Sequence, residues 1–358
     1  MIDKTTIKTI KMTEKASIRD ELRKAPRLDW LFFELTDRCN LRCLHCGSNC
    51  ADGNSTMLEP ELIMNCLNTV AEDFEPNDVK IAITGGEPLL YPYFEEVIGH
   101  VNKLGFRWGM TTNGTLIDDK CAEMLKKLKL SSVSISLDGL SDTHDELRHK
   151  PGAWEKAIRG IKALRKQSIP VQITTVIHKK NFSQLYPLYE KLLELDIFSW
   201  RIVNIESIGR AAENSDLLLS YDEFKVLADI IRELRYKSYV PFDVRFGCSH
   251  YLSFEYENEL RNHYFMCGAG ITVASVTAKG DIFACLDIER RPELIQGNIS
   301  KDRFSEVWYN RFKSFRKDRT ILCDECRECN EKNFCAGDSF HTWDFENNRP
   351  MFCLKHRL

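Results

Sequence analysis

Short β-rich runs alternate with amphipathic stretches between residues 30 and 236, and this alternation constrains the fold more than any other feature. The β-rich runs are 30–36, 79–84, 106–112, 131–137, 171–177 and 199–205. The helix-like stretches are 58–74, 94–105, 118–128, 153–167, 182–195 and 221–237. Strands that alternate with helices of this length form βαβ units around a parallel sheet. Six units are too few for a closed eight-stranded barrel, so we predict an α/β fold with a partial, TIM-like (β/α)6 barrel.

The pattern changes after residue 240. The runs 271–276 and 281–286 flank TAKGD and predict a short hairpin with Gly280 in its turn. A predicted helix over 302–317 precedes a cysteine-rich segment with few apolar residues, which needs metal to fix its structure. The predicted domains are an N-terminal extension with one helix (1–29), the barrel (30–236) and a small cysteine-rich C-terminal domain (237–358).

Composition narrows the class of protein. The formal net charge of −3 over 358 residues gives no basic excess, so no nucleic-acid partner is expected. No apolar run is long enough to span a membrane, and the N-terminus lacks the apolar core of a secretory signal, which predicts a cytoplasmic protein. In that reducing compartment, the clustered cysteines among the 14 are expected to bind metal rather than to form disulfides, whereas Cys66 and Cys121, in helix-like stretches, are expected to be ordinary buried cysteines.

Three cysteines follow the first β-rich run in CNLRCLHC, at Cys39, Cys43 and Cys46. In a β/α barrel this loop lies on the face where active sites are built. Three soft thiolates suit an iron–sulfur cluster or zinc. A four-iron cluster held by three thiolates leaves one iron open to a small molecule. The alternative is a zinc site completed by His45 or Cys50.

This loop resembles the signature of radical S-adenosylmethionine (SAM) enzymes. The resemblance implies a [4Fe-4S] cluster on Cys39, Cys43 and Cys46, with SAM as the ligand of the fourth iron and His45 beside its adenine. In that family, one electron cleaves SAM and the 5′-deoxyadenosyl radical takes a hydrogen atom from the substrate. Cys50 creates a second possible register, but the first matches the family spacing, so Cys50→Ala is expected to leave SAM cleavage intact.

Motifs at the following strand ends extend the resemblance. TGGEP ends the second run; taken alone it could be any tight turn, but in the family this stretch binds the SAM amino group. TTNGTLI and SISLDG end the third and fourth runs, and HDELRHK follows. The alternative is that the asparagine and glycines of these motifs only form turns and that Arg148 is a solvated surface arginine. The SAM-binding residues that the resemblance implies are Gly85, Gly86, Glu87, Pro88, Asn113, Ser136, Asp138 and Arg148, the last as a partner of the SAM carboxylate.

The tail resembles the SPASM extension of radical SAM enzymes. An auxiliary iron–sulfur cluster is expected on Cys326, Cys329, Cys335 and Cys353. The spacing Cys267-x12-Gly280-x4-Cys285 is also similar to that extension, but Ser339 stands where a further cysteine is common. A first auxiliary cluster would therefore use Cys248, Cys267 and Cys285, with Cys323 as an optional fourth ligand. The alternatives are a cluster with an open or non-cysteine position and the absence of this cluster, so one or two auxiliary clusters are expected. The alternative is a zinc knuckle. Asp338 is interpreted as a helix cap or a solvated carboxylate rather than as a base.

The resemblance implies a radical SAM oxidoreductase of the maturase type, which cleaves SAM reductively and modifies a peptide or protein by hydrogen abstraction. A reductant such as flavodoxin or ferredoxin is the expected redox partner. The 29 residues before the first run are too few for a separate leader-binding domain. The alternatives are a radical SAM dehydrogenase acting on a small molecule and a non-catalytic iron–sulfur or zinc protein.

Overall fold

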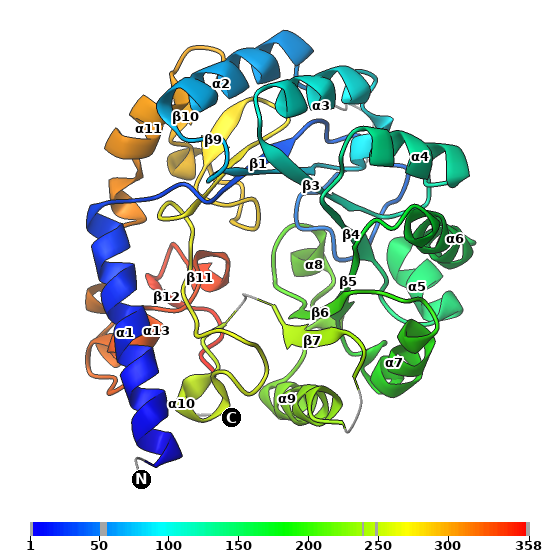
Figure 1. The fold of residues 1–358 in the computed structure, drawn as a ribbon. Coiled ribbons are helices and arrows are strands. Elements are labelled where there is room, and N and C mark those ends of the chain that lie inside the picture. The colour runs from blue at the N-terminus through cyan, green and yellow to red at the C-terminus, as the bar shows by residue number, and fades with distance from the viewer. Residues whose placement is uncertain (1–2, 51–55, 238–239, 248–249, 356–358) are drawn as a thin grey trace.

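The computed structural model describes residues 3–50, 56–237, 240–247 and 250–355. In this part of the chain a ten-stranded sheet has the order β10-β9-β8-β1-β2-β3-β4-β5-β6-β7, and β11 and β12 form a separate pair. The parallel strands curve into an incomplete ring with helices on its outside, and the C-terminal tail lies by its opening (Figure 1). Cys248 lies outside the described residues.

The predicted partial barrel is confirmed. Its parallel strands are β1 (Trp30–Glu34), β2 (Lys80–Thr84), β3 (Arg107–Thr112), β4 (Ser132–Ser136), β5 (Val171–Ile177), β6 (Ser199–Asn204) and β7 (Asp243–Phe246). Its helices are α2 (Pro60–Asp73), α3 (Phe94–Lys103), α4 (Asp119–Lys127), α5 (Ser141–Arg148), α6 (Ala153–Lys166), α7 (Leu185–Leu193), α8 (Arg210–Glu213) and α9 (Tyr221–Arg235). Strand β7 adds a seventh parallel strand that the sequence pattern did not single out.

The two faces of the sheet differ in chemistry. Outward residues such as Ile81, Trp108 and Ile135 are buried in one core under the helices, which explains the apolar stripe of each helix. The inward row across β3, β4, β5 and β6 consists of Thr111, Ser134, Gln172 and Ser199. The hydroxyls of Ser134 and Thr174 lie 2.7 Å apart on this inner face. Polar side chains therefore line this part of the barrel interior, and Val176 and Val203 follow on the same inner face of β5 and β6.

The tail continues the barrel sheet. Strand β8 (Val273–Val276) pairs in parallel with β1 and antiparallel with β9 (Asp281–Phe283), and β9 pairs with β10 (Gly297–Asn298). The predicted β8–β9 hairpin is confirmed, and Gly280 in its turn has φ +82°. The remaining elements are α10 (Ser253–Tyr256), α11 (Phe304–Asn310), α12 (Asp324–Arg327), α13 (Lys332–Cys335), β11 (Trp343–Asp344) and β12 (Arg349–Pro350). Short 3-10 helices are η1 (Pro88–Leu90), η2 (Phe182–Gln184), η3 (Ser215–Leu217), η4 (Pro292–Leu294), η5 (Phe312–Ser314), η6 (Thr320–Leu322) and η7 (Phe340–Thr342).

The N-terminal extension forms one long helix, α1 (Lys4–Lys24), as predicted. It lies beside α13 of the tail (Figure 1). Arg19 is buried and donates from Nη1 to the carbonyl oxygen of Asn333 at 2.9 Å. A buried arginine thus joins the N-terminal helix to the tail.

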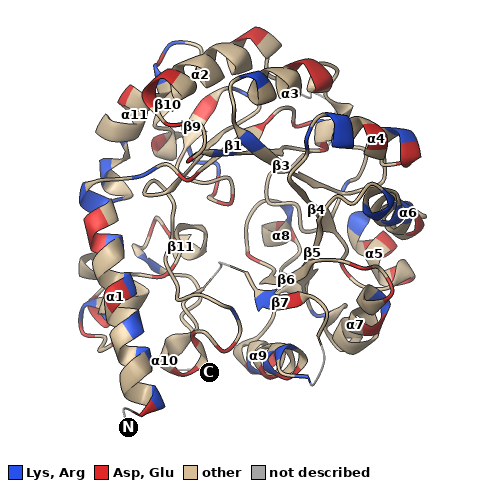
Figure 2. Ribbon diagram, viewed as in Figure 1, with Lys and Arg blue, Asp and Glu red and all other residues tan. Residues whose placement is uncertain are grey.

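Basic and acidic residues are interspersed along the outer helices (Figure 2). Among the described residues, no helix combines the length and the apolar character needed to cross a membrane.

Candidate active site

The cysteine loop after β1 gathers three thiols. Cys39 and Cys46 pack against the buried Cys43, together with Leu41 and Ala153. Burial raises the pKa of Cys39 to about 11 and raises that of Cys43 as well. Buried thiols of this kind become thiolates when a metal supplies positive charge. The donor set therefore fits a cluster held by three cysteines.

Cys50 also lies close to this set. Its thiol is buried, and a hydrogen bond between the thiols of Cys50 and Cys46 is the main cause that lowers the pKa of Cys46 to about 5. Both registers of the motif therefore bring their cysteines to the same loop, and the choice of Cys39 over Cys50 stays a prediction.

A buried arginine holds the cysteine loop from the β6 side. Arg210 donates from Nε to the carbonyl oxygen of Cys43 and from Nη1 to that of Cys50, both at 2.8 Å. Its backbone N–H donates to the carbonyl oxygen of Cys46 at 3.0 Å. Gly209 precedes it with φ +57°, and a Cβ there would lie 2.5 Å from the carbonyl oxygen of Cys46. Arg210 was missed in the sequence because an arginine far along the chain carries no local signal of this contact.

The glycine pair of TGGEP lets β2 end directly against the cysteine loop. A Cβ on Gly85 or Gly86 would lie 2.3 Å from the carbonyl oxygen of Thr36 or Arg38, respectively. The Gly86 N–H donates to the Thr36 carbonyl oxygen at 2.8 Å. The close approach that requires glycine is thus to the backbone that carries the cysteines. Pro88 begins the short helix η1 that follows.

Glu87 joins two strand ends. Its side chain is fully buried, accepts from the Thr112 hydroxyl at 2.7 Å and from the Asn113 N–H at 2.9 Å. Burial raises the pKa of this carboxyl to about 7, although these hydrogen bonds favour the charged form. Asn113 in turn donates from Nδ2 to Asn40 Oδ1 at 2.9 Å and points the same nitrogen at Cys39 Sγ, 3.9 Å away. These contacts connect the β2 and β3 ends to the cysteine loop.

Asp138 and Arg148 form a buried ion pair beside the cysteines. Burial raises the pKa of the Asp138 carboxyl, but Arg148, His45, His144 and a hydrogen bond from the Val176 N–H together outweigh burial and lower this pKa to about 2. Arg148 Nη1 also points at Cys43 Sγ at 3.5 Å. His45 Nε2 lies 3.7 Å from Asp138 Oδ2, and burial followed by the charge of Arg148 lowers the pKa of His45 to about 3. Ser136, half-buried, ends β4 on the inner face.

Several buried polar atoms of this site have no hydrogen-bond partner among the described residues. They are His45 Nδ1, Arg148 Nε, His144 Nε2 and His178 Nε2. Because buried polar atoms are almost always paired, such a group of unpaired ones indicates room for a polar ligand. His144, in helix α5, and His178, directly after β5, were not predicted; both lie near Asp138 and neither carries a motif of its own. The residues present therefore fit SAM.

The tail brings its predicted cysteines together. The Cys326 thiol lies close enough to Cys353 and Cys329 to interact with their charges, and the Cys335 thiol lies equally within reach of the charge of Cys353. Lys355 Nζ donates to Cys329 Sγ at 3.3 Å, and the Asp338 N–H donates to Cys335 Sγ at 3.2 Å. Four gathered thiols with donors aimed at their sulfurs fit a fully coordinated auxiliary cluster.

The other predicted tail cysteines lie in two places. The thiol of Cys323 is hydrogen-bonded to that of Cys326, which places it beside the four-cysteine set. Cys267 lines a small cavity with Cys335 and Arg319, and Cys285 follows β9. Ser339 is fully buried, and its hydroxyl lies 2.9 Å from that of Thr342. The described residues thus supply Cys267 and Cys285 for a first auxiliary cluster, and its ligand set stays a prediction.

No three histidine, cysteine or carboxylate side chains of the described residues converge on a point that would hold one metal ion. A four-iron cluster does not need such convergence, because each thiolate binds a different iron.

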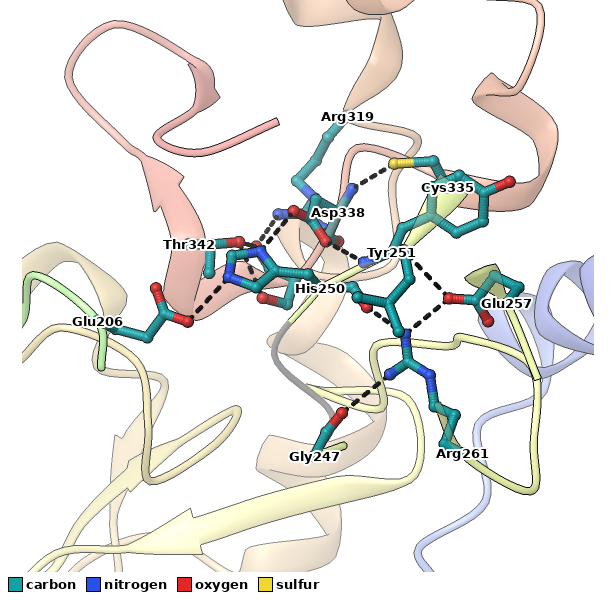
Figure 3. A network of polar contacts seen from close by, with 12 residues as sticks. Glu206, Gly247, His250, Tyr251, Glu257, Arg261, Arg319, Cys335, Asp338 and Thr342 are labelled. Carbon is teal, nitrogen blue, oxygen red and sulfur yellow. Dashed lines mark hydrogen bonds and ion pairs between the residues drawn. The ribbon is translucent and has the colours of Figure 1, made fainter. Parts of the chain in front are cut away.

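A buried polar bridge joins the barrel to the tail (Figure 3). His250 lies between Glu206, 3.0 Å from its Nε2, and Asp338, 3.2 Å from its Nδ1. Asp338 is only 4% exposed and also accepts from the Tyr251 N–H at 2.8 Å. The expectation of a solvated Asp338 is therefore wrong. The fully buried Arg261 holds this segment by donating to Gly247, His250 and Glu257.

Known proteins resemble this arrangement. Residues 33–192 match the radical SAM superfamily, and residues 267–330 match the SPASM iron–sulfur cluster-binding domain. The chain therefore carries a radical SAM domain, which is a domain of enzymes, and a SPASM domain in its tail. These two domains imply a [4Fe-4S] cluster that binds SAM and auxiliary iron–sulfur clusters in the tail.

Two similar proteins have names that describe different activities. An AdoMet-dependent heme synthase from Methanosarcina barkeri is 28% identical over 334 residues, which cover 88% of this chain and 92% of that protein. The antilisterial bacteriocin subtilosin biosynthesis protein AlbA of Bacillus subtilis is 25% identical over 325 residues, covering 85% of this chain and 66% of that protein.

Solved structures share the fold. Native anSMEcpe with bound AdoMet and Cp18Cys peptide has a TM-score of 0.69 at 19% identity, covering 89% of this chain and 90% of that one. Streptococcus suis SuiB bound to S-adenosylmethionine has a TM-score of 0.67 at 21% identity, covering 94% and 79%. At these identities the likeness concerns the fold alone.

Proposed function

We propose that this protein is a radical SAM enzyme that cleaves SAM reductively and modifies a peptide or protein substrate by hydrogen abstraction. The observation that carries the proposal is the gathering of Cys39, Cys43 and Cys46 beside the Asp138–Arg148 pair at the strand ends. A cluster on these thiolates would supply the electron that cleaves the carbon–sulfur bond of SAM.

The residues of this chain would position SAM and keep water out. Arg148 keeps Nε free for a carboxylate while Asp138 holds its other end. His45, neutral and buried, would pack beside the adenine. Glu87 would fix the two strand ends around the ligand by holding Thr112 and Asn113, and Leu41 and Ala153 would exclude water from the cysteines.

A peptide or protein substrate is supported by the polar inner face of the barrel. Thr111, Ser134, Thr174 and Gln172 can donate to and accept from the backbone of an extended peptide. A porphyrin macrocycle would instead require a pocket lined mainly by apolar side chains. AlbA, named as a bacteriocin biosynthesis protein, is also among the relatives.

A porphyrin side chain is the second candidate substrate. It is favoured by the similarity to the AdoMet-dependent heme synthase, which extends over 92% of that protein.

Two assays separate these candidates. The anaerobically reconstituted enzyme, given SAM and dithionite, is expected to form 5′-deoxyadenosine; a non-catalytic iron–sulfur or zinc protein would form none. Deuterated peptides encoded beside its gene, deuterated iron porphyrins and deuterated small metabolites are then compared as substrates. Deuterium in 5′-deoxyadenosine from a peptide supports the first candidate. Deuterium from the porphyrin alone supports the second, and deuterium from a small metabolite instead of either rejects both.

We further propose that the chain works in the cytoplasm with flavodoxin or ferredoxin as its reductant. Within it, residues 30–236 would form the catalytic barrel and residues 237–358 the auxiliary-cluster domain, with residues 1–29 as an extension. The pairing of β8 with β1 supports a rigid connection between these parts.

A further inference from the structure

Two arginines continue the polar inner face of the barrel onto its last two parallel strands. The registers of β4 to β7 place Ser136 beside Thr174, Thr174 beside Arg201, and Arg201 beside Arg245. Because residues paired across a sheet point to the same face, these four side chains form one inner row. Figure 2 shows basic residues (blue) where β6 and β7 lie side by side. The row thus leads from a strand end expected to lie near SAM to two guanidinium groups.

Water reaches both arginines from the inside of the barrel. Arg201 is half-buried, and the side chain of Arg245 is 34% exposed. The next residues on the same strands, Ile202 and Phe246, point to the other face and are fully buried in the core under the helices. Because side chains alternate along a strand, the accessible parts of the two arginines lie on the inner face.

Gly247 leaves room for the side chain of Arg201. This glycine follows β7, and its N–H donates to the carbonyl oxygen of Ile202 at 2.7 Å. A Cβ at position 247 would lie 3.2 Å from Arg201 Nε and 2.4 Å from Val203 Cγ1. Because Val203 follows Arg201 on the inner face, the Arg201 side chain extends toward the carboxyl end of β6. In a parallel sheet the carboxyl ends share one edge, so Arg201 extends toward the side where the cysteine loop lies.

The Arg245 guanidinium is oriented by neighbours on the inner face. Its Nη2 donates to Gln172 Oε1 at 2.7 Å, and its Nη1 lies 3.5 Å from Asp243 Oδ2. Asp243 also accepts from Asn262 Nδ2 at 2.7 Å and lies 3.7 Å from Arg235 Nη1, so its charge is shared between two arginines. A guanidinium carries five N–H donors, and these contacts therefore orient Arg245 while leaving it donors for a ligand.

Cations outweigh the carboxylate near Arg245. Burial, followed by the charges of Arg261, Arg245 and Lys15, lowers the pKa of His263 to about 4, against a smaller opposing effect of Asp243. The surroundings of this part of the inner face are therefore positive, which favours the binding of an anion.

Other carboxylates close to β6, β7 and the segment after them have cationic partners of their own. Glu257 is paired with Arg261, and Glu206 lies 3.0 Å from His250 Nε2. Glu259 acts on Arg235. The negative charges of these three residues are thus matched where they stand.

We propose that Arg201 and Arg245 bind a carboxylate of the substrate and hold it in the barrel interior, in the row that begins at Ser136. This assignment rests on the proposed function, under which the carboxylate belongs to an aspartate or glutamate of the peptide near the modified residue. A planar guanidinium can take both oxygens of a carboxylate, and two guanidiniums on neighbouring strands favour an acidic side chain over its neutral amide. An iron porphyrin with carboxylate side chains carries the same chemical group.

Selection from a peptide library tests the assignment. The reconstituted holoenzyme, immobilised with SAM in the absence of oxygen, is given a library of short random peptides, and the retained peptides are sequenced. We expect aspartate or glutamate to be enriched over asparagine or glutamine at one position by roughly tenfold or more, which is the contribution of a single charge-assisted hydrogen bond. R201M and R245M, each compared at full iron content, should lose this enrichment, and R245K should keep part of it.

Arg107 provides a matched control. It lies on the same face of the sheet as Thr111 but at the amino end of β3, where it is exposed and donates to the carbonyl oxygen of Asn77 at 3.2 Å. R107M should therefore retain the enrichment of the wild type. Binding of an iron porphyrin with free carboxylates is measured in parallel with that of its methyl ester, which lacks the charges.

The outcomes separate this inference from the proposed function. Absence of acidic enrichment in the wild type, together with equal binding of the porphyrin acid and ester, would overturn the inference. So would enrichment that persists in R201M or in R245M. Preference for the porphyrin acid over the ester, lost in both variants and without any peptide enrichment, would support the carboxylate site and reject the peptide substrate of the proposed function.

Discussion

Arg210 is expected to control how firmly the cysteine loop holds its cluster. The side chain is 8% exposed and makes two hydrogen bonds of 2.8 Å, to the carbonyl oxygens of Cys43 and Cys50. Hydrogen bonds from a charged donor contribute about 1.5–3 kcal/mol each. R210M removes both hydrogen bonds. Water can reach the two freed carbonyl oxygens once the loop opens, so the lower end of that range applies, and the closed loop should lose about 3 kcal/mol of stability in total.

That free energy corresponds to a roughly hundredfold rise in the population of the open loop. Iron should therefore leave the barrel cluster roughly a hundred times faster when an iron chelator is added to R210M. The rate is followed by the visible absorbance of chelated iron, in a background where the tail cysteines are intact and their irons serve as an internal reference. R210K, which keeps the charge and can keep one bond, should fall between wild type and R210M.

Arg107 offers the matched control, because it is exposed and donates only to the carbonyl oxygen of Asn77, at 3.2 Å. R107M should release iron at the wild-type rate. If R210M and R107M release barrel iron equally fast, the loop does not depend on this arginine and the reasoning is refuted.

Three further outcomes follow from the same contacts. G86A would place a Cβ 2.3 Å from a backbone carbonyl oxygen, so it should lower the melting temperature and the barrel iron content, whereas G99A, with nothing within 4 Å, should do neither. D138N should lower the free energy of unfolding by roughly 3–5 kcal/mol, because it leaves Arg148 buried without its partner. The pKa of Asp138 in the folded protein is lowered to about 2, so this difference between wild type and D138N should stay constant from pH 5 to 8. It should shrink only as the pH falls from about 4 toward 2, which urea titrations at each pH would measure. Burial opposes protonation of His250, but its carboxylate neighbours raise its pKa to about 10. The stability that the protonated His250 adds is therefore complete below about pH 6.5 and is lost as the pH rises toward 10. The melting temperatures of wild type and H250Q should converge over that range, and a constant difference would contradict the ion pairs of His250 with Glu206 and Asp338.

The sequence pattern predicted the barrel because its strands and helices carry strong periodicities. The helix over 153–167 was expected and α6 spans Ala153–Lys166, since Ile158, Ile161 and Leu164 repeat at helical spacing. Strand β7 was missed because Asp243–Phe246 is only four residues long. The parallel pairing of β8 with β1 was missed for another reason: it joins residues more than two hundred positions apart, and no local pattern specifies such a partner.

Site residues were predictable where a motif fixes them to a strand end. Cys39, Cys43 and Cys46 gather after β1, and Asp138 meets Arg148 after β4. The structure also shows contacts that the spacing of motifs along the sequence cannot predict. The carboxylate of Glu87 is engaged with protein groups, so its role beside SAM would be to hold the strand ends together.

The tail also contains a contact that the sequence could not predict. Asp338 reads as an ordinary polar residue of a loop, yet its burial depends on His250, which lies in a segment without periodicity. A buried ion bridge between distant segments has no sequence signal, because each member alone resembles a surface residue.

The most direct test of the account is SAM cleavage by the purified chain. With full iron content, strict absence of oxygen, dithionite and SAM, the protein should convert SAM to 5′-deoxyadenosine and methionine, detected by mass spectrometry, and a variant with alanine at Cys39, Cys43 and Cys46 should not. Full iron content without any 5′-deoxyadenosine would contradict the assignment of the barrel cysteines to a SAM-cleaving cluster.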